Sequence, residues 1–420
     1  MRAFMLGWEF PPFISGGLGT ACYGLTKAMS RLGIQITFVL PKASITGQNS
    51  HVKMLSSEGY INTEELTELK NVRFRKINSP LKPYVASGIY SRQDRKNNNS
   101  HSWHSAHSGQ FDNYGWDMYE QVQRYAAKAV EIAALENFDI IHAHDWMTYP
   151  AGVNTAKITH KPLIVHVHST EFDRSGEHVN QMIYDIERWG MHFADRVIAV
   201  SNYTKNIIIH RYGVPSEKVE VVYNGVECNN GIYHQSLPEK NDRIVLFLGR
   251  ITMQKGPEYF LAAAKKVLGI IENVKFVMAG DGDMLHRTIE LAAQFGIGHK
   301  VLFTRFLRGS DVDRMYQMAD LYVMPSVSEP FGIAPLEALQ HDVPVLISRQ
   351  SGIAEVLKHA LKVDFWDINQ MANKIIAVLN HPPLRTALCE NGRHEVNKFQ
   401  WENSAARVKD IYEQTLAFSA

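Results

Sequence analysis

The stretch that most constrains the fold is Leu321–Leu339, where a short apolar segment is followed by a loop and a helix start. Leu321–Pro325 has the length and the apolar character of a buried strand. Pro335 indicates a helix start, because proline is favoured in the first turn. In a parallel α/β sheet, loops of this kind at the carboxyl ends of strands form the ligand crevice. We therefore expect residues 326–334 to line a binding site.

Two carboxylates stand eight residues apart across this loop, Glu329 before the helix and Glu337 in its first turn. Such a pair can hold two different parts of one ligand. Gly332 allows the backbone to approach that ligand closely, and the N–H groups of Gly332, Ile333 and Ala334 would be donors at the helix start. The alternative is a solvated charge at Glu329 and a helix-dipole contact at Glu337.

The same alternation of apolar runs and turns recurs along the 420 residues, a length that suggests two or three domains. Residues 228–241 are polar and rich in Gly, Asn and Pro, so we place a domain linker there. We expect helices at 23–32, 119–135, from 203, and up to 416. The expected strands are 2–6, 33–40, 71–77, 138–146, 163–171, 195–201 and 219–223, then 243–248, 274–279, 301–304, 321–325 and 345–348.

Two further strand ends carry residues suited to phosphate. Gly16 and Gly17 belong to a glycine-rich turn between a strand and a helix, although such glycines can also serve only to shape a turn. Arg250 follows the strand 243–248, and Lys255 precedes a helix start. The planar fork of Arg and the point charge of Lys both suit phosphate oxygens, and together they can replace a metal ion; the alternative is two surface cations.

Histidines form two H-x-H pairs in the expected strands 138–146 and 163–171. Residues two apart on a strand share a face, so each pair could chelate a metal, but the alternative is a set of interior histidines and we expect no metal site. Asp145 and His168 differ from the others because they fall where strands end, at the crevice edge. Residues 91–110 are almost without apolar side chains and are expected to form a mobile surface loop.

Composition excludes several classes of protein. Lys plus Arg total 44 and Asp plus Glu 43, so the chain lacks the basic excess of a general nucleic-acid binder. Three cysteines without metal spacing indicate a reducing compartment and no disulfide framework. No segment approaches the roughly 18 apolar residues of a membrane span, and the apolar run at residues 3–6 is too short for a signal peptide. We expect a cytoplasmic protein.

Several motifs resemble those of retaining glycosyltransferases with the GT-B fold, including glycogen and starch synthases and glycosyltransferase family 4. The resemblance covers nearly the whole chain and implies two Rossmann-like α/β domains facing each other across a deep cleft. Residues 1–230 would form the acceptor-side domain, residues 240–400 would bind the nucleotide sugar, and a last helix at about 402–420 would rejoin the first domain. The motifs are E-P-F-G-I-A-P-L-E, G-R-x4-K-G, W-E-F-P-P-x-x-x-G-G-L-G, H-D-W and S-G-I-A-E.

The resemblance also implies roles for individual residues. Arg250 and Lys255 would hold the diphosphate, Glu337 the ribose, and Glu329, with the amides around Gly332, the sugar hydroxyls. His168 would lie beside the reacting carbon of the donor sugar, and Asp145 would line the sugar pocket. The sequence departs from the family at Ile14, where a Lys is usual, and at Ser351, where a Gly is usual.

The implied activity is transfer of a sugar, with glucose favoured, from ADP- or UDP-glucose to a glycan acceptor with retention at the anomeric carbon. No cofactor and no metal is expected. One alternative is a family 4 enzyme of cell-surface polysaccharide or glycolipid synthesis, with peripheral membrane contact. Another, of a different class, is a non-catalytic protein that binds nucleotide sugars or glycans.

Overall fold

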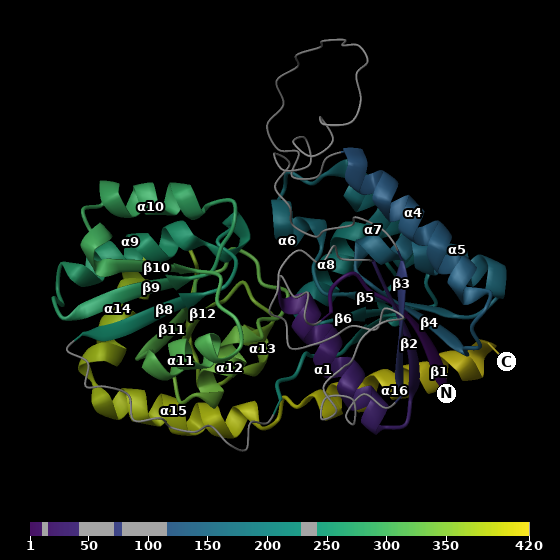
Figure 1. Ribbon diagram of the computed structural model, residues 1–420. Helices are drawn as coiled ribbons and strands as arrows, with labels where there is room; N and C mark the ends of the chain where they lie inside the picture. The colour runs from purple at the N-terminus through teal and green to yellow at the C-terminus, as the bar shows by residue number, and fades with distance from the viewer. Residues whose placement is uncertain (11–15, 42–70, 78–115, 228–241, 420) are drawn as a thin grey trace, which may run out of the picture.

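A computed structural model of the chain describes residues 1–10, 16–41, 71–77, 116–227 and 242–419. Ile14, the loop at 91–110 and the linker at 228–241 lie outside these ranges. Figure 1 shows two lobes, each built on one sheet with helices on both faces. We call the part around the sheet of residues 2–221 the first lobe and the part around the sheet of residues 243–363 the second lobe.

The described part of the first lobe contains a seven-stranded sheet in the order β3-β2-β1-β4-β5-β6-β7, and all its pairings are parallel. Chain order reverses between β1 and β4, which is a topological switch point. The strands are β1 (Arg2–Leu6), β2 (Gln35–Pro41), β3 (Val72–Ile77), β4 (Ile140–His144), β5 (Leu163–Val167), β6 (Arg196–Ala199) and β7 (Val219–Val221).

The second lobe repeats this plan with six described strands in the order β10-β9-β8-β11-β12-β13, again all parallel. Its switch point lies between β8 and β11. The strands are β8 (Arg243–Leu248), β9 (Val274–Ala279), β10 (Val301–Arg305), β11 (Leu321–Met324), β12 (Val345–Ser348) and β13 (Leu361–Val363).

Where the structure describes the connection between parallel neighbours, that connection contains a helix, as parallel pairing favours. The helices of the first lobe are α1 (Gly17–Arg31), α4 (Trp116–Ala133), α5 (Tyr149–Thr159), α6 (Glu171–Ser175), α7 (Gln181–Phe193) and α8 (Asn202–Tyr212). Those that follow are α9 (Pro257–Leu268), α10 (Leu285–Gln294), α11 (Ser310–Met318), α12 (Ala334–Gln340), α13 (Ile353–Val356), α14 (Ile368–Asn380), α15 (Pro382–Val396) and α16 (Trp401–Ser419).

The last helix, α16, lies along the first lobe rather than the second (Figure 1). Its apolar side chains, among them Trp401 and Tyr412, belong to the same hydrophobic core as β1 and α1. Gly24 of α1 makes this contact possible, because a Cβ at that position would lie 2.2 Å from the Trp401 ring. The chain therefore crosses between the lobes at least twice.

The structure corrects several boundaries. The helix expected at 23–32 begins at Gly17, so Gly16 is its N-cap and Gly17 its first residue rather than members of a free turn. The strand expected to reach residue 146 ends at His144, because Asp145 has φ of 59° and turns the chain. Likewise β5 ends at Val167. Helices α5, α6, α7, α10, α11, α13, α14 and α15 and strand β13 were not predicted.

Candidate functional site

A cavity of about 480 Å³ lies between the lobes, at the carboxyl ends of strands from both sheets. We call it the interlobe cavity. Its wall includes every residue that the sequence singled out, although they come from five separate segments of the chain. These residues are Gly16, Gly17, Asp145, His168, Arg250, Lys255, Glu329, Gly332, Ile333, Ala334 and Glu337.

Lys255 and Glu329 form an ion pair in this wall. The Lys255 ammonium forms an ion pair with Glu329 Oε2, and Ser326 Oγ donates to the same oxygen at 3.3 Å. The backbone of Glu329 is also fixed, because its N–H donates to the carbonyl of Gln350 at 2.9 Å and its carbonyl accepts from Gly352 at 2.9 Å. Glu329 is buried, so its carboxylate has one defined position at the cavity wall.

The backbone after Glu329 needs a glycine. Gly332 has φ of 105°, a conformation that side-chain-bearing residues rarely adopt, and a Cβ there would meet Glu329 Cγ at 3.3 Å. Helix α12 follows, with Ile333 as N-cap, Ala334 as first residue and Pro335 in the first turn. The predicted helix start is therefore confirmed, and the first N–H groups lie at the cavity.

Glu337 is held by α11, a helix that carried no sequence motif. Tyr316 donates its hydroxyl proton to Glu337 Oε2 at 3.0 Å, and the Tyr316 ring stacks on His341 with 5.3 Å between ring centroids. Burial raises the pKa of Glu337, while the Tyr316 hydrogen bond and His341 lower it. The carboxylate is thus positioned by a rigid neighbour and keeps one face toward the cavity.

The helix α1 brings a positive end to the cavity opposite Arg250. A Cβ on Gly16 would lie 3.7 Å from Arg250 Nε, so the two lobes approach closely at this point. The N-cap Gly16 is extended and offers no side-chain acceptor; Glu9 Oε2 accepts from Gly19 N–H at 3.1 Å instead. A helix N-terminus beside two cations is an arrangement that favours anions.

Asp145 and His168 form the floor on the first lobe. Asp145 Oδ1 accepts from the N–H of His168 at 2.7 Å and from that of Ser169 at 3.4 Å. Burial raises the pKa of Asp145 to about 7, although these two hydrogen bonds act in the opposite direction. Burial also lowers the pKa of His168 well below its usual range, with the neighbouring His144 as a second cause. This side of the cavity therefore offers hydrogen-bonding groups with little net charge near neutral pH.

The histidines of the two H-x-H pairs, which the sequence left as interior residues or metal ligands, stack in one group that includes His168 of the floor. His144 Nδ1 lies 3.0 Å from His168 Nε2. His142 Nδ1 lies 2.6 Å from the Tyr412 hydroxyl of α16. The buried Nε2 atoms of His144 and His166 have no hydrogen-bond partner among the described residues.

Residues 306–309, after β10, also line the cavity and were missed by the sequence analysis. They include Phe306 and Arg308, whose guanidinium lies 5.3 Å from the Phe306 ring centroid. The segment matches none of the motifs quoted above. Its place directly after an expected strand was the one signal available, since strand ends form the crevice.

The loop that carries Glu329 also touches the first lobe. Ser201 Oγ donates to the carbonyl of Pro330 at 2.5 Å, and Ser328 Oγ donates to Asp173 Oδ1 at 2.5 Å. The Glu355 carboxylate of α13 accepts from the N–H groups of Asn202 at 2.8 Å and Tyr203 at 3.1 Å, at the start of α8. The position of Glu329 is thus coupled to the contact between the lobes.

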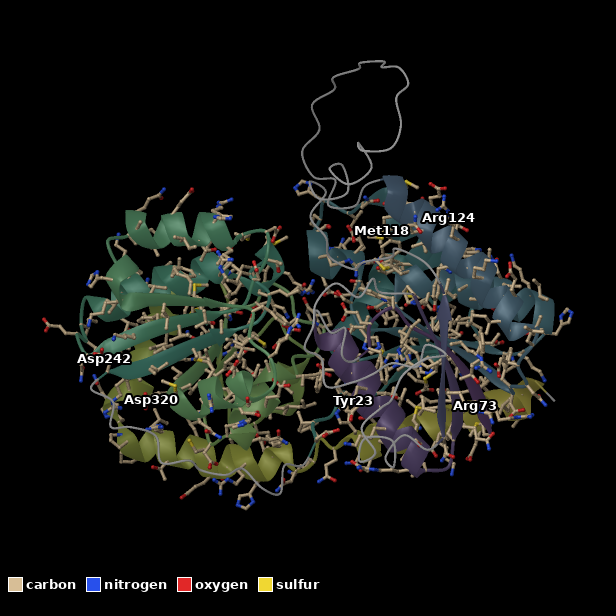
Figure 2. The ribbon with its side chains drawn as sticks, viewed as in Figure 1. Tyr23, Arg73, Met118, Arg124, Asp242 and Asp320 are labelled. Atoms are coloured by element: carbon tan, nitrogen blue, oxygen red, sulfur yellow. The ribbon has the colours of Figure 1, made fainter. Side chains whose placement is uncertain are left out.

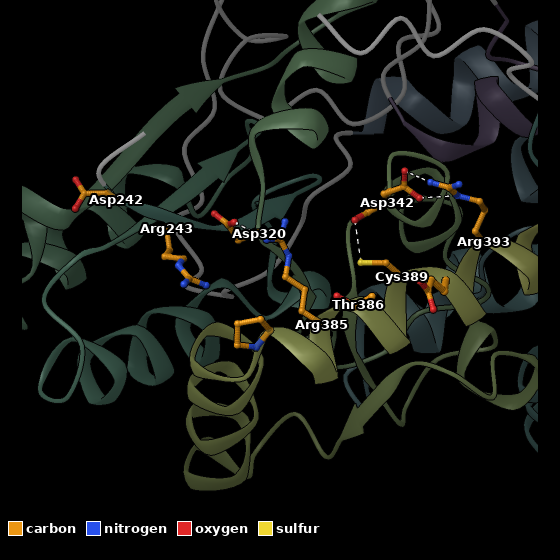
Figure 3. A pocket seen from close by; sticks show the side chains of 10 residues that line it. Asp242, Arg243, Asp320, Asp342, Arg385, Thr386, Cys389 and Arg393 are labelled. Carbon is orange, nitrogen blue, oxygen red and sulfur yellow. Dashed lines mark hydrogen bonds and ion pairs between the residues drawn. The ribbon is translucent and has the colours of Figure 1, made fainter. Parts of the chain in front are cut away.

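A second cavity, of about 500 Å³, lies in the second lobe and has a different character (Figure 3). We call it the outer cavity; Figure 2 shows Asp242 and Asp320 of its wall at the end of the lobe away from the first lobe. Arg393 pairs with Asp342, and Arg385 lies 3.4 Å from Asp320. Asp320 and Arg243 lie at the amino ends of β11 and β8, opposite the edge where α/β sheets bind ligands.

Comparison with known proteins assigns the family. Residues 230–395 match the family model of group 1 glycosyl transferases, and residues 115–230 match that of glycosyltransferase family 4. An uncharacterized glycosyltransferase of Methanocaldococcus jannaschii is 30% identical, with 98% of each chain covered. The chain belongs to glycosyltransferase family 4. A glycogen synthase of Mycobacterium tuberculosis is 22% identical to this glycosyltransferase over 98% of the chain and 94% of the relative.

Solved structures show the same fold at low sequence identity. Sucrose-phosphate synthase from Thermosynechococcus elongatus is 20% identical, with a TM-score of 0.74 and 99% of each chain covered. Anabaena HepE in complex with UDP and glucose is 18% identical, with a TM-score of 0.70 and coverage of 99% of this chain and 100% of that one. The predicted GT-B fold of the glycosyltransferase is confirmed. None of its described helices combines the length and apolarity needed to cross a bilayer.

Proposed function

We propose that this glycosyltransferase moves a hexosyl group from a nucleotide sugar to a glycan acceptor with retention at the anomeric carbon. The observation that carries the proposal is that the cations and carboxylates of the second lobe and the floor of the first lobe line one cavity, the interlobe cavity. A nucleotide sugar has a diphosphate, a ribose and a sugar, and the cavity wall offers a distinct group for each. HepE, a structural neighbour, was solved with UDP and glucose, which supports a nucleotide-sugar donor here.

The diphosphate is assigned to Arg250, Lys255 and the N-terminus of α1. Negative charge builds on the diphosphate as the sugar–phosphate bond breaks, so fixed cations stabilise the transition state more than the ground state. Lys255 is paired with Glu329. Donor binding therefore places a phosphate oxygen and a carboxylate around one ammonium, and Lys255 links the diphosphate to the residue that faces the sugar.

The ribose and the sugar of the donor are assigned to the other groups of the cavity wall. Glu337, held by Tyr316, accepts from the ribose hydroxyls, and Glu329 with the amides near Gly332 binds hydroxyls of the sugar. His168 and Asp145 complete the sugar pocket from the first lobe. The acceptor hydroxyl attacks on the face from which the diphosphate leaves, its oxygen forms the new bond to the anomeric carbon, and its proton passes to the leaving phosphate.

We propose that Arg250 and Lys255 supply the charge stabilisation that a divalent metal provides in other transferases, so that turnover needs no metal. The glycogen synthase relative, matched along nearly its full length, favours glucose and an α-glucan acceptor. A second candidate acceptor is a lipid-linked glycan. It is supported by a 27% identical galactosyltransferase of Escherichia coli that acts on a diphosphoundecaprenol-linked sugar, and the match covers 66% of this chain.

The decisive experiment is to measure nucleotide release from ADP- and UDP-activated hexoses, with and without glycogen or an undecaprenol-linked acceptor, in excess chelator. We expect release to rise with one donor and one acceptor class. Activity that is lost in EDTA and restored by magnesium or manganese would contradict the metal-independent assignment. Tight donor binding with no release for any acceptor would favour a non-catalytic nucleotide-sugar binder.

A further inference from the structure

A thiol and two imidazoles meet behind the floor of the interlobe cavity. Cys22 comes from α1, His144 is the last residue of β4, and His168 follows β5. One ligand atom of each lies within 4.8 Å of the others. Cys22 and His144 are fully buried, whereas His168 is only partly buried and reaches the cavity.

This donor set matches a known metal chemistry. Zinc binds thiolate sulfur and imidazole nitrogen at about 2.0–2.3 Å, which puts the ligand atoms of a tetrahedral site roughly 3.5 Å apart. The His144 Nδ1 to His168 Nε2 distance is 3.0 Å, so these two nitrogens already face each other at close to that spacing. His144 also carries a buried Nε2 atom without a partner among the described residues, which leaves this ring free to exchange tautomers.

We propose that Cys22, His144 and His168 form a binding site for a zinc-class divalent cation, with the fourth coordination position open toward the interlobe cavity. Three protein ligands and one open position are typical of accessible zinc sites. The Cys22 thiol loses its proton to solvent when the metal binds. The proton shared between His144 and His168 moves to the outer nitrogen of one ring, so that each imidazole remains neutral.

The position of His168 gives this site a consequence for catalysis, and this part rests on the proposed function. A metal held by His168 removes that side chain from the sugar pocket and places a cation where the sugar lies. Metal and donor sugar therefore exclude each other, and zinc acts as an inhibitor of a transferase that itself needs no metal.

A neighbouring group of three histidines, His142, His144 and His166, also has ligand atoms within 4.8 Å of one another. It suits a cation less well, because all three are fully buried and His142 already contacts the Tyr412 hydroxyl at 2.6 Å. The two sites share His144 and differ in whether a thiolate takes part. A sulfur-sensitive probe separates them.

The test is a titration of the chelator-treated, full-length protein with Co²⁺. We expect a thiolate-to-cobalt charge-transfer band in the near-ultraviolet that is absent in Cys22→Ser and Cys22→Ala and retained in Cys389→Ser, a matched control on α15. Thermal unfolding of each variant establishes that it is folded. If one of the two substitutions at position 22 prevents folding, the other still tests the site. No band in the wild type, or a band that survives both substitutions, would overturn the site.

A second measurement addresses inhibition separately. With the donor and acceptor that the nucleotide-release assay identifies, Zn²⁺ should inhibit the wild type in competition with the nucleotide sugar. Cys22→Ser should keep its basal turnover and need at least tenfold more Zn²⁺ for the same inhibition. A cobalt band without zinc inhibition would leave the metal site standing and refute its link to the sugar pocket.

Discussion

The two halves of the interlobe cavity differ in how they carry charge. The second-lobe half presents Arg250, Lys255, Glu329 and Glu337, which are groups suited to phosphates and a ribose. The first-lobe half presents Asp145, whose pKa burial raises to about 7, and a histidine whose pKa burial lowers. Under the proposed function, we assign the leaving diphosphate to the charged half and the donor sugar to the nearly neutral half.

The outer cavity shows that neither size nor charge alone identifies a site. It is as large as the interlobe cavity and also contains arginines and carboxylates. There, however, Arg393 and Asp342 neutralise each other, and the Asp320 carboxylate also accepts from the N–H of Ile244 at 2.8 Å. These ion pairs join α15 to the segments that precede β11 and β12.

The largest loss of turnover is expected when the cations of the charged half are removed. Lys255→Ala and Arg250→Ala should each reduce turnover about a hundredfold or more, the loss typical for one preorganised group that stabilises transition-state charge. Arg250→Lys should not restore full activity, because the bidentate fork is gone. The measurement is steady-state donor turnover, with Arg393→Ala in the outer cavity as the control. An equal loss in that control would show that a general effect of removing charge is being measured.

The two carboxylates should separate binding from turnover. Each makes charge-assisted hydrogen bonds, so its loss should cost roughly 2 kcal/mol. This corresponds to about thirtyfold in turnover for Glu329 and in nucleotide affinity for Glu337. Glu329→Gln should lower turnover while the free nucleoside diphosphate still binds normally. Glu337→Gln should weaken binding of that nucleotide itself. Calorimetry with the nucleoside diphosphate distinguishes the two variants, and the reverse pattern would refute the assignment.

A smaller effect is expected in the neutral half. His168→Ala removes a neutral hydrogen-bonding group from the sugar pocket, which typically costs about 1 kcal/mol, or roughly fivefold in turnover. Affinity for the free nucleoside diphosphate should stay unchanged, because we assign the diphosphate to the other half. A loss of nucleotide affinity as large as that of Glu337→Gln would mean that the two halves do not divide the donor in this way.

A separate prediction concerns stability and its dependence on pH, and not turnover. The Asp145 carboxyl has a pKa of about 7 in the folded state, against 3.8 for an unperturbed Asp. Between about pH 4 and pH 7 the unfolded chain releases this proton while the folded state keeps it, so the free energy of unfolding falls as pH rises. Asp145→Asn has no carboxyl proton to release at this position, so its free energy of unfolding should fall less across that pH window. Urea unfolding at pH 4.5 and pH 7.5 measures the difference, and parallel changes in both proteins would contradict a raised pKa.

Much of the local structure could be read from the sequence. The bounds of β1, β8, β9 and β12 coincide with the apolar runs, because a strand buried on both faces is a continuous apolar segment. Helices α5, α6, α7, α10, α11, α13, α14 and α15 and strand β13 were missed. Two predicted bounds were wrong. Strand β4 ends before Asp145, which has a positive φ, and α1 begins at Gly17, six residues before the predicted start.

The sequence by itself determined which residues stand at strand ends, and hence which can reach a crevice, since that order is a property of short segments. Only the tertiary structure decided which of them meet. The approach of Gly16 to Arg250, the pairing of Lys255 with Glu329 and the proximity of Cys22 to His144 join segments that are far apart in the chain. Local pattern carries no information about such distances. The pKa of Asp145 was likewise beyond sequence reasoning, because burial is set by the packing of the whole lobe.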